Sequence, residues 1–350
     1  MAWPIMAKTT ETTLKGAESL ALIDGFGRKI DYLRLSITDK CNLKCLYCMP
    51  PFSGRPHLAQ TEILNYEELY RLAEAAVTTG VSKIRVTGGE PLVRKGVIGF
   101  CEMLGKLRGL TDLSLTTNGI HLAAMAAPLR KAGVNRINIS LDTLRPDTFA
   151  DIAGRSRFDA VWTGIRQAEA VGFSPIKINV VVMRGVNDQE IDKMAAMTYA
   201  HPWHVRFIEL MPFKTSTHDA YRQLYLPVGA IMKKIPHIEA AQLVPADATN
   251  GPARLCTLPG AKGKIGFIAP LSWHFCSTCN RLRVTADGNI RPCLFSEKEI
   301  DVKDPLRSGA TRAELAALIQ QASKTKPQGH FQEPYQARAH PWRTMRAIGG

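Results

Sequence analysis

Residues 31–48 read DYLRLSITDKCNLKCLYC, an apolar, strand-like run followed at once by three closely spaced cysteines. The alternation in 31–38 predicts a β-strand, and Cys41, Cys45 and Cys48 then share one short loop after it. Cysteine sulfur is the usual protein ligand of iron–sulfur clusters, so three thiolates on such a loop can hold three irons of a cubane. The fourth iron of that cubane would stay open to a small ligand.

The alternation of strand-like and helix-like segments continues from this loop to about residue 212. Five more strand-like runs follow, at 83–87, 113–117, 136–141, 176–183 and 205–210. Apolar residues at helical spacing occupy 66–79, 96–107, 121–131, 158–171 and 188–199. Strands that alternate with helices indicate βαβ units and a parallel sheet. We therefore predict an α/β fold in which right-handed crossovers curl six units into a partial (βα)6 TIM-like barrel.

Polar motifs stand at or just beyond the C-terminal ends of these predicted strands. The cysteine loop follows the first strand, and Gly88-Gly89-Glu90 follows the second. The third, fourth and sixth strands end in Thr116-Thr117-Asn118, Ser140-Leu141-Asp142 and Glu209-Leu210-Met211. In βα barrels this rim is where active sites are built, so we expect one site at the mouth of the barrel.

The pattern changes after residue 212. A short helix is predicted at 228–234 and another at 313–322, and a segment rich in Pro, Gly and Ala covers 245–263. We expect three parts: an N-terminal extension (1–26), the partial barrel (27–212), and a C-terminal region (213–350) that closes the open side of the barrel.

The C-terminal region carries a second group of thiols, Cys276, Cys279 and Cys293. One interpretation is a zinc site with His274 as fourth ligand, because structural zinc takes four ligands. The other is a second three-cysteine iron–sulfur cluster with an open iron. Arg281 and Arg283 lie between these thiols, on one face of a strand-like segment, and two such guanidinium groups suit phosphate binding.

Composition limits the remaining choices. The formal net charge of +14 favours an anionic partner, yet no long Lys/Arg run marks a nucleic-acid tail. No apolar run approaches the roughly 20 residues of a membrane helix, and the first 25 residues lack the features of a secretory signal. We expect a cytoplasmic protein, with the mitochondrial matrix as the alternative. Six of the eight cysteines are grouped as in metal sites, and Cys101 and Cys256 are expected to be structural.

Taken in order, these motifs resemble one family over roughly residues 27–350. They are the three N-terminal cysteines, TGGEP (87–91), LTTNG (115–119), SLD (140–142), RFIELMP (206–212), FCSTCNRLR (275–283), RPCL (291–294) and the terminal Gly349-Gly350. This combination is similar to the GTP 3′,8-cyclases, the molybdenum cofactor biosynthesis protein A family of the radical S-adenosylmethionine (SAM) superfamily. The weakest similarity lies in 1–26 and 236–262.

The resemblance implies a set of site residues. Cys41, Cys45 and Cys48 would hold the [4Fe–4S] cluster that binds SAM, and Cys276, Cys279 and Cys293 a second [4Fe–4S] cluster. SAM would lie against Tyr47, Gly89, Glu90, Ser140 and Met211. GTP would be bound by Arg34, Arg85, Thr116, Lys177, Arg281 and Arg283. The catalytic residues would be Cys41, Cys45 and Cys48 together with Arg281 and Arg283. In this family the Gly-Gly tail reaches into the active site.

The resemblance also implies an activity and partners. The expected reaction converts GTP to (8S)-3′,8-cyclo-7,8-dihydroguanosine 5′-triphosphate through a 5′-deoxyadenosyl radical, as the first step of molybdenum cofactor biosynthesis. A homodimer, an electron donor, and cyclic pyranopterin monophosphate synthase as the next enzyme are expected, with neither nucleic acid nor membrane. The alternatives are a peptide-modifying radical SAM enzyme with an auxiliary cluster, and a basic zinc protein that binds nucleic acid.

Overall fold

The computed structural model describes residues 21–48, 57–212, 218–245, 251–329 and 343–349. Its strands form one twelve-stranded sheet in the order β12-β11-β10-β1-β2-β3-β4-β5-β6-β9-β8-β7. The strands are β1 (Tyr32–Ser36), β2 (Lys83–Thr87), β3 (Asp112–Thr117), β4 (Arg136–Ser140), β5 (Lys177–Val182), β6 (His204–Glu209), β7 (Gln242–Val244), β8 (Arg254–Thr257), β9 (Lys264–Ile268), β10 (Arg281–Val284), β11 (Asn289–Arg291) and β12 (Ile300–Asp301).

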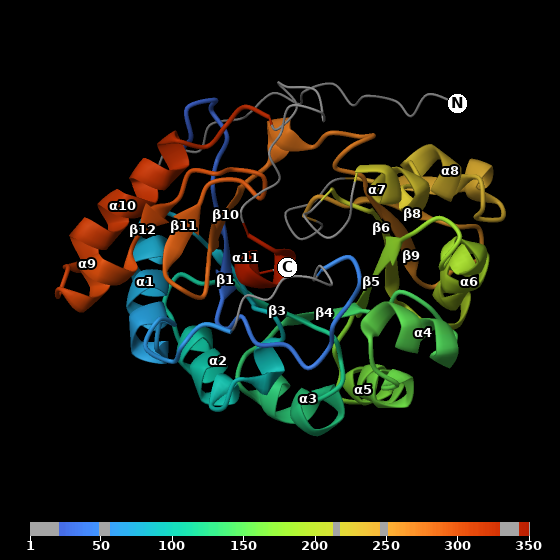
Figure 1. Ribbon diagram of the computed structural model, residues 1–350, viewed down its shortest axis with the longest axis horizontal. Helices are drawn as coiled ribbons and strands as arrows, with labels where there is room; N and C mark the ends of the chain where they lie inside the picture. The colour runs from blue at the N-terminus through green and yellow to red at the C-terminus, as the bar shows by residue number, and fades with distance from the viewer. Residues whose placement is uncertain (1–20, 49–56, 213–217, 246–250, 330–342, 350) are drawn as a thin grey trace.

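Helices line the outside of this curled sheet (Figure 1). They are α1 (Tyr66–Thr78), α2 (Val97–Gly105), α3 (Leu122–Lys131), α4 (Pro146–Ala153), α5 (Phe158–Ala170), α6 (Ile191–Ala200), α7 (His218–Leu224), α8 (Val228–Met232), α9 (Lys303–Arg307), α10 (Arg312–Lys324) and α11 (Met345–Ile348). Short 3₁₀ turns occur at Pro91–Val93, Asp188–Glu190, Ile238–Ala240 and Cys276–Thr278. The exception is α11, which lies inside the curve of the sheet near the chain end (Figure 1).

The six predicted strands are confirmed as β1 to β6, and each pairs in parallel with the next. The C-terminal region adds one parallel strand at each edge, β10 beside β1 and β9 beside β6. Each is followed outward by antiparallel strands, so the sheet curls without its end strands β12 and β7 pairing. The partial α/β barrel is therefore confirmed, and eight of its strands run parallel.

Local sequence explains most of the outer helices. Helix α1 begins with a capping box, in which Asn65 accepts from the backbone N–H of Glu68 and the Glu68 carboxylate accepts in return. The helix predicted at 188–199 instead starts with a 3₁₀ turn and continues as α6. Helices α4, α7, α9 and α11 were not predicted, because short helices of four to eight residues carry little periodic signal.

The alternation in β1 separates the core from the interior of the barrel. Leu33 and Leu35 point outward and are buried in the layer between sheet and helices, together with the apolar face of α1. Arg34 points the other way and lines the interior cavity. Cys101 and Cys256 are fully buried in the apolar core, as expected for structural cysteines.

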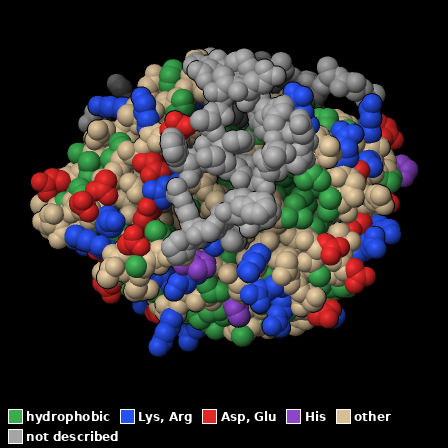
Figure 2. Space-filling view, in the orientation of Figure 1, with side chains coloured by type: hydrophobic (Ala, Val, Ile, Leu, Met, Phe, Trp, Pro, Cys, Tyr) green, Lys and Arg blue, Asp and Glu red, His purple; other side chains and the backbone are tan. Residues whose placement is uncertain are grey.

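Charges of both signs are mixed over the face that carries the mouth of the barrel (Figure 2). The surplus of positive charge therefore does not form one continuous Lys/Arg patch on this face. Within the described parts of the chain, no helix is both long and apolar enough to cross a membrane.

Candidate active site

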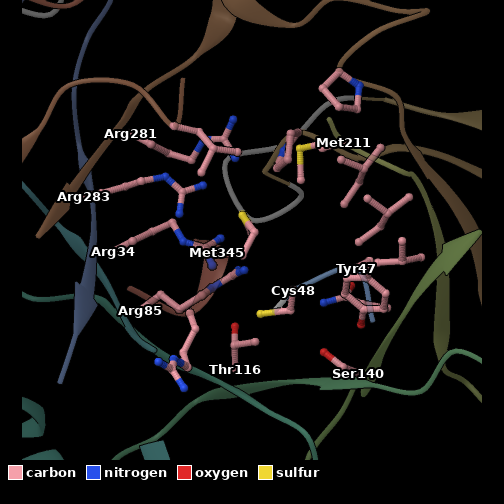
Figure 3. A pocket seen from close by; sticks show the side chains of 18 of the residues that line it. Arg34, Tyr47, Cys48, Arg85, Thr116, Ser140, Met211, Arg281, Arg283 and Met345 are labelled. Atoms are coloured by element: carbon pink, nitrogen blue, oxygen red, sulfur yellow. The ribbon is translucent and has the colours of Figure 1, made fainter. Parts of the chain in front are cut away.

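A cavity of about 300 Å³ occupies the interior of the barrel, and both cysteine groups line it. Figure 3 shows two sides to this cavity: Arg34, Arg85, Arg281 and Arg283 lie on one side, and Tyr47, Ser140 and Met211 on the other. Glycines, carboxylates and amides from the C-terminal ends of β2, β3, β4 and β6 complete the lining. The rim predicted from the strand ends is therefore a single site.

The first cysteine loop is held by backbone contacts to α4. The N–H of Lys44 donates to the carbonyl of Ala153 (2.9 Å), and that of Leu46 to the carbonyl of Ile152 (3.0 Å). The Sγ of Cys41 accepts from the backbone N–H of Leu43 at 3.4 Å and from the Asn118 amide at 3.9 Å. Cys45 and Cys48 are half-buried on the same loop. The loop thus presents three free thiols to the cavity from a fixed backbone.

Gly88 and Gly89 pack directly against the segment that leads into this loop. A Cβ at Gly89 would lie 2.4 Å from the carbonyl oxygen of Lys40, and one at Gly88 2.7 Å from that of Thr38. The N–H of Gly89 donates to the Thr38 carbonyl at 2.6 Å. A glycine pair at a strand end leaves room for close approach, and the group that approaches here is the chain's own cysteine loop.

Two of the acidic residues at the rim, Glu90 and Asp142, bind groups of the chain itself. Glu90 is buried and accepts from Thr117 Oγ1 (2.8 Å) and from the backbone N–H of Asn118 (2.6 Å). Burial raises the pKa of Glu90 to about 7. Asp142 accepts from the Tyr47 hydroxyl at 2.8 Å, and burial raises the pKa of Asp142 to about 6. Both carboxyls are therefore held in place beside the first cysteine loop.

Buried cations hold the second cysteine group. Arg28 donates to the carbonyl oxygen of Cys276 (2.6 Å). Lys326 donates to the carbonyl oxygens of Arg281 and Pro292, each at 2.8 Å, and so joins the chain segments that carry Cys279 and Cys293. Burial raises the pKa of Cys279, but the charges of Arg281 and Lys326 outweigh it and bring the pKa down to about 6. A thiol with such a pKa readily supplies a thiolate ligand.

The three cysteine thiols of each group are the kind of donor that holds an iron–sulfur cluster. Among the described residues, no three His, Cys, Asp or Glu side chains converge closely enough to hold one ion. In a cubane each thiolate binds a different iron, so the three sulfurs stand further apart than around one ion. His274, the fourth ligand in the zinc interpretation, has its Nδ1 3.1 Å from the carbonyl oxygen of Pro270. Each group offers three partly exposed thiols, none of them in a disulfide, at the wall of one cavity.

Three adjacent strands place arginines side by side on the opposite wall. Arg34 on β1 is in register with Arg283 on β10 and with Arg85 on β2. Burial, together with these two neighbouring cations, lowers the pKa of Arg34 well below its usual value. Burial and the charge of Arg281 lower the pKa of Arg283 to about 9. A bound polyanion would relieve this repulsion, so the wall is suited to phosphates.

Most predicted site residues meet at the cavity. Tyr47, Gly89, Glu90, Ser140 and Met211 line it, as do all six grouped cysteines and, of the predicted GTP ligands, Arg34, Arg85, Thr116, Arg281 and Arg283. Lys177 is buried at the start of β5 and is not among the lining residues.

Other lining residues had no predicted role. Arg206 and Asn179 line the cavity from β6 and β5. The two-residue period of these strands indicates which of their residues face the interior, and it could have identified both. Tyr32 stands two residues before Arg34 on the same face of β1. Lys326 follows α10, and no local signal indicates its position.

The C-terminal tail enters the cavity. Met345 and Arg346 of α11 line it, and the carbonyl oxygen of Gly349 accepts from Arg283 Nη1 at 2.9 Å. The expected approach of the tail to the active site is therefore seen for Gly349, while Gly350 lies outside the described residues.

Two family models cover most of the chain. Residues 35–198 match the Radical SAM superfamily, and residues 203–332 match Molybdenum Cofactor Synthesis C. The GTP 3′,8-cyclase of Moorella thermoacetica is 49% identical over 330 residues, which cover 93% of this chain and 99% of that protein. The chain belongs to the GTP 3′,8-cyclase family. The enzyme of Geobacter sulfurreducens is 45% identical, over 95% of this chain and all of its own length.

Membership settles the activity. This GTP 3′,8-cyclase is a radical SAM enzyme that uses iron–sulfur chemistry to cyclise GTP in the first step of molybdenum cofactor biosynthesis. Neither the peptide-modifying nor the zinc-protein alternative is favoured. Among solved structures, Streptococcus suis SuiB bound to S-adenosylmethionine has a TM-score of 0.60 at 15% identity, over 83% of this chain and 68% of that chain. That likeness concerns the fold alone.

Proposed function

We propose that one side of the cavity binds SAM and the other side binds GTP. Cys41, Cys45 and Cys48 would hold a [4Fe–4S] cluster, and that cluster would bind SAM. Tyr47, Gly89, Glu90, Ser140 and Met211 form the SAM side. Their common position around the first cysteine loop, opposite the arginines, supports this assignment. Glu90 and Gly89 act mainly by fixing the cysteine loop and the Asn118 turn against each other.

The arginine side binds GTP. Arg34, Arg85, Arg281 and Arg283, with Thr116, are the groups we assign to it. Lys177 is retained as a ligand because it shares the inward face of β5 with the lining residue Asn179. The single observation that carries this assignment is the register of Arg283, Arg34 and Arg85 on three neighbouring strands. Three mutually repelling cations at one wall favour a triphosphate over a neutral ligand.

Cys276, Cys279 and Cys293 would hold a second [4Fe–4S] cluster, on the same side of the cavity as the arginines that we assign to GTP. When bound, the reduced first cluster and SAM supply the 5′-deoxyadenosyl radical that starts the cyclisation of the ribose 3′ carbon onto guanine C8. The chain's own residues on the two sides of the cavity set the positions of the two reactants relative to each other. That control matters because a displacement of about 1 Å can cost ~100-fold in rate.

Substitution of one cysteine in each group tests this division. Cys41→Ala should abolish both SAM cleavage and product, and iron should fall from about eight to about four per chain by cluster stoichiometry. Cys276→Ala should lose product and a similar share of iron while some unproductive SAM cleavage survives. Cys101→Ala, in the core, should keep both clusters. Normal product from Cys276→Ala would remove the second cluster from the reaction.

The GTP side has its own test. Arg281→Ala should weaken GTP binding at least tenfold, because a charge-assisted hydrogen bond to an anion is worth about 1.5–3 kcal/mol. SAM binding should not change. An unaltered affinity for GTP would take Arg281 out of the substrate site.

Division into an N-terminal extension (1–26), a barrel (27–212) and an auxiliary-cluster region (213–350) also remains our proposal. The family matches at 35–198 and 203–332 support a division near residue 200. We further propose a cytoplasmic homodimer that takes electrons from a separate donor and passes its product to cyclic pyranopterin monophosphate synthase. Gel filtration with light scattering under anaerobic conditions tests the dimer.

A further inference from the structure

Tyr32 is the first residue of β1 and the most enclosed aromatic side chain on the arginine wall. Its side chain is 5% exposed and lines the cavity. In register it lies between Arg281 on β10 and Lys83 on β2. Lys83 forms a salt bridge with Asp31, whose carboxylate lies 2.8 Å from the lysine Nζ. Tyr32 therefore stands in the row of side chains next to the one formed by Arg283, Arg34 and Arg85.

The Tyr32 hydroxyl is shielded from water, and it has no hydrogen-bond partner among the described residues. Burying a hydroxyl without a partner costs free energy, so buried polar groups are nearly always paired. If this side chain served only for packing, phenylalanine would fill the same space without the cost of burying an unpaired hydroxyl. The hydroxyl therefore points to a partner that the described part of the chain does not supply.

The charges around Tyr32 indicate what that partner is. The guanidinium of Arg85 lies over its ring at 5.4 Å from the centroid. Burial alone would raise the pKa of Tyr32, but Arg85, Arg34 and Arg281 together bring it below its ordinary value. A phenol surrounded by cations is a stronger hydrogen-bond donor, and its best acceptor is an anionic oxygen.

We propose that Tyr32 is a substrate-binding residue that donates its hydroxyl hydrogen to an anionic oxygen of the GTP triphosphate. The inference rests on the proposed placement of GTP against the arginine wall and extends it by one uncharged donor. Arginines attract the triphosphate from a distance, whereas the phenol on its short, rigid side chain can fix the angle of one phosphate.

Tyr32→Phe is the matched substitution, because it removes one oxygen and keeps the ring under Arg85. The reconstituted full-length enzyme is titrated anaerobically with GTP, GDP, GMP and guanosine. We expect GTP to bind about tenfold more weakly, which is the usual effect of losing one hydrogen bond to a charged group. The affinity of the variant for guanosine should lie within twofold of the wild-type value. As phosphates are removed along the series, the first ligand that both proteins bind equally well lacks the phosphate that Tyr32 contacts. The metal-free variant should be at least as thermally stable as wild type.

Tyr199→Phe, at an exposed position of α6, serves as the control for the loss of a phenol oxygen. If Tyr32→Phe binds GTP as wild type does, or if guanosine loses as much affinity as GTP, the proposal is wrong. Arg283→Ala measured in the same series separates the two ideas. If Arg283→Ala binds GTP more weakly while Tyr32→Phe binds it as wild type does, only the role of Tyr32 is rejected. Unchanged binding in both rejects the triphosphate site as a whole.

Discussion

Arg283 Nη1 donates to the carbonyl oxygen of Gly349 at a distance of 2.9 Å. The same arginine belongs to the wall to which we assign GTP, so one side chain contacts both the chain end and the substrate site. Arg343, just before α11, is held by Asp287 and Glu299, each at 2.7 Å. The described part of the tail, 343–349, is therefore held at both Arg343 and Gly349.

Gly349→Ala should displace the tail. The residue has φ +85°, and an added Cβ would lie 2.7 Å from both the Ser36 Cβ and the Thr87 Oγ1. A non-glycine residue in the left-handed region costs about 1–3 kcal/mol, so tail docking should weaken roughly tenfold or more. We expect product formation to fall at least tenfold while thermal stability changes little. Gly309→Ala has the same φ but open space around it, and it should leave activity intact.

Gly89→Ala should disturb the first cysteine loop. The new methyl would overlap the carbonyl oxygens of Lys40 and Asp39, which are backbone atoms that cannot move aside independently. We expect loss of about half of the bound iron and no SAM cleavage, measured by iron analysis and 5′-deoxyadenosine release. Gly99→Ala, inside α2 with nothing within 4 Å, should retain full iron and gain up to about 1 kcal/mol of stability. Full iron in Gly89→Ala would contradict the packing argument.

Lys326→Met should affect only the second cysteine group. The substitution removes two hydrogen bonds that join the segments carrying Cys279 and Cys293, and it removes a cation near both thiols. We expect preferential loss of the second cluster, seen as a halved iron content and a missing component in the electron paramagnetic resonance spectrum. SAM cleavage without product should remain. Lys324→Met, exposed on α10, is the control. Two intact clusters in Lys326→Met would show that the loops need no such link.

The raised pKa of Glu90 predicts that the free energy of unfolding depends on pH. Its pKa is raised by burial to about 7, so between pH 4.5 and 7 the folded chain holds a proton that the unfolded chain has released. Stability therefore falls as pH rises through this window and is constant above it. Relative to Glu90→Gln, the free energy of unfolding of the metal-free wild type should fall by about 3 kcal/mol from pH 4.5 to 7, at about 1.4 kcal/mol per pKa unit. Urea titrations at several pH values measure this. A constant difference between the two proteins would mean that Glu90 is ionised throughout.

Local pattern was sufficient for the regular elements of the barrel. The strands β1 to β6 and the longer helices follow from apolar periodicity, because each must bury one face against the same layer. The edge strands β10 and β9 were not predicted as barrel strands. Their pairing partners, β1 and β6, are set by where the C-terminal region folds back, and a run of four or five residues does not specify that.

The sequence by itself determined the two groups of three thiols, the βα rhythm and the motifs of the rim, because spacing along the chain limits which atoms a short loop or a strand face can bring together. Only the tertiary structure decided that Tyr32, Arg206 and Lys326 join the site, that Gly89 packs on the cysteine loop, and that Lys177 is buried at the start of β5. These features depend on the register of strands that are far apart in sequence and on side-chain direction. Both are fixed only when the whole sheet curls around its interior.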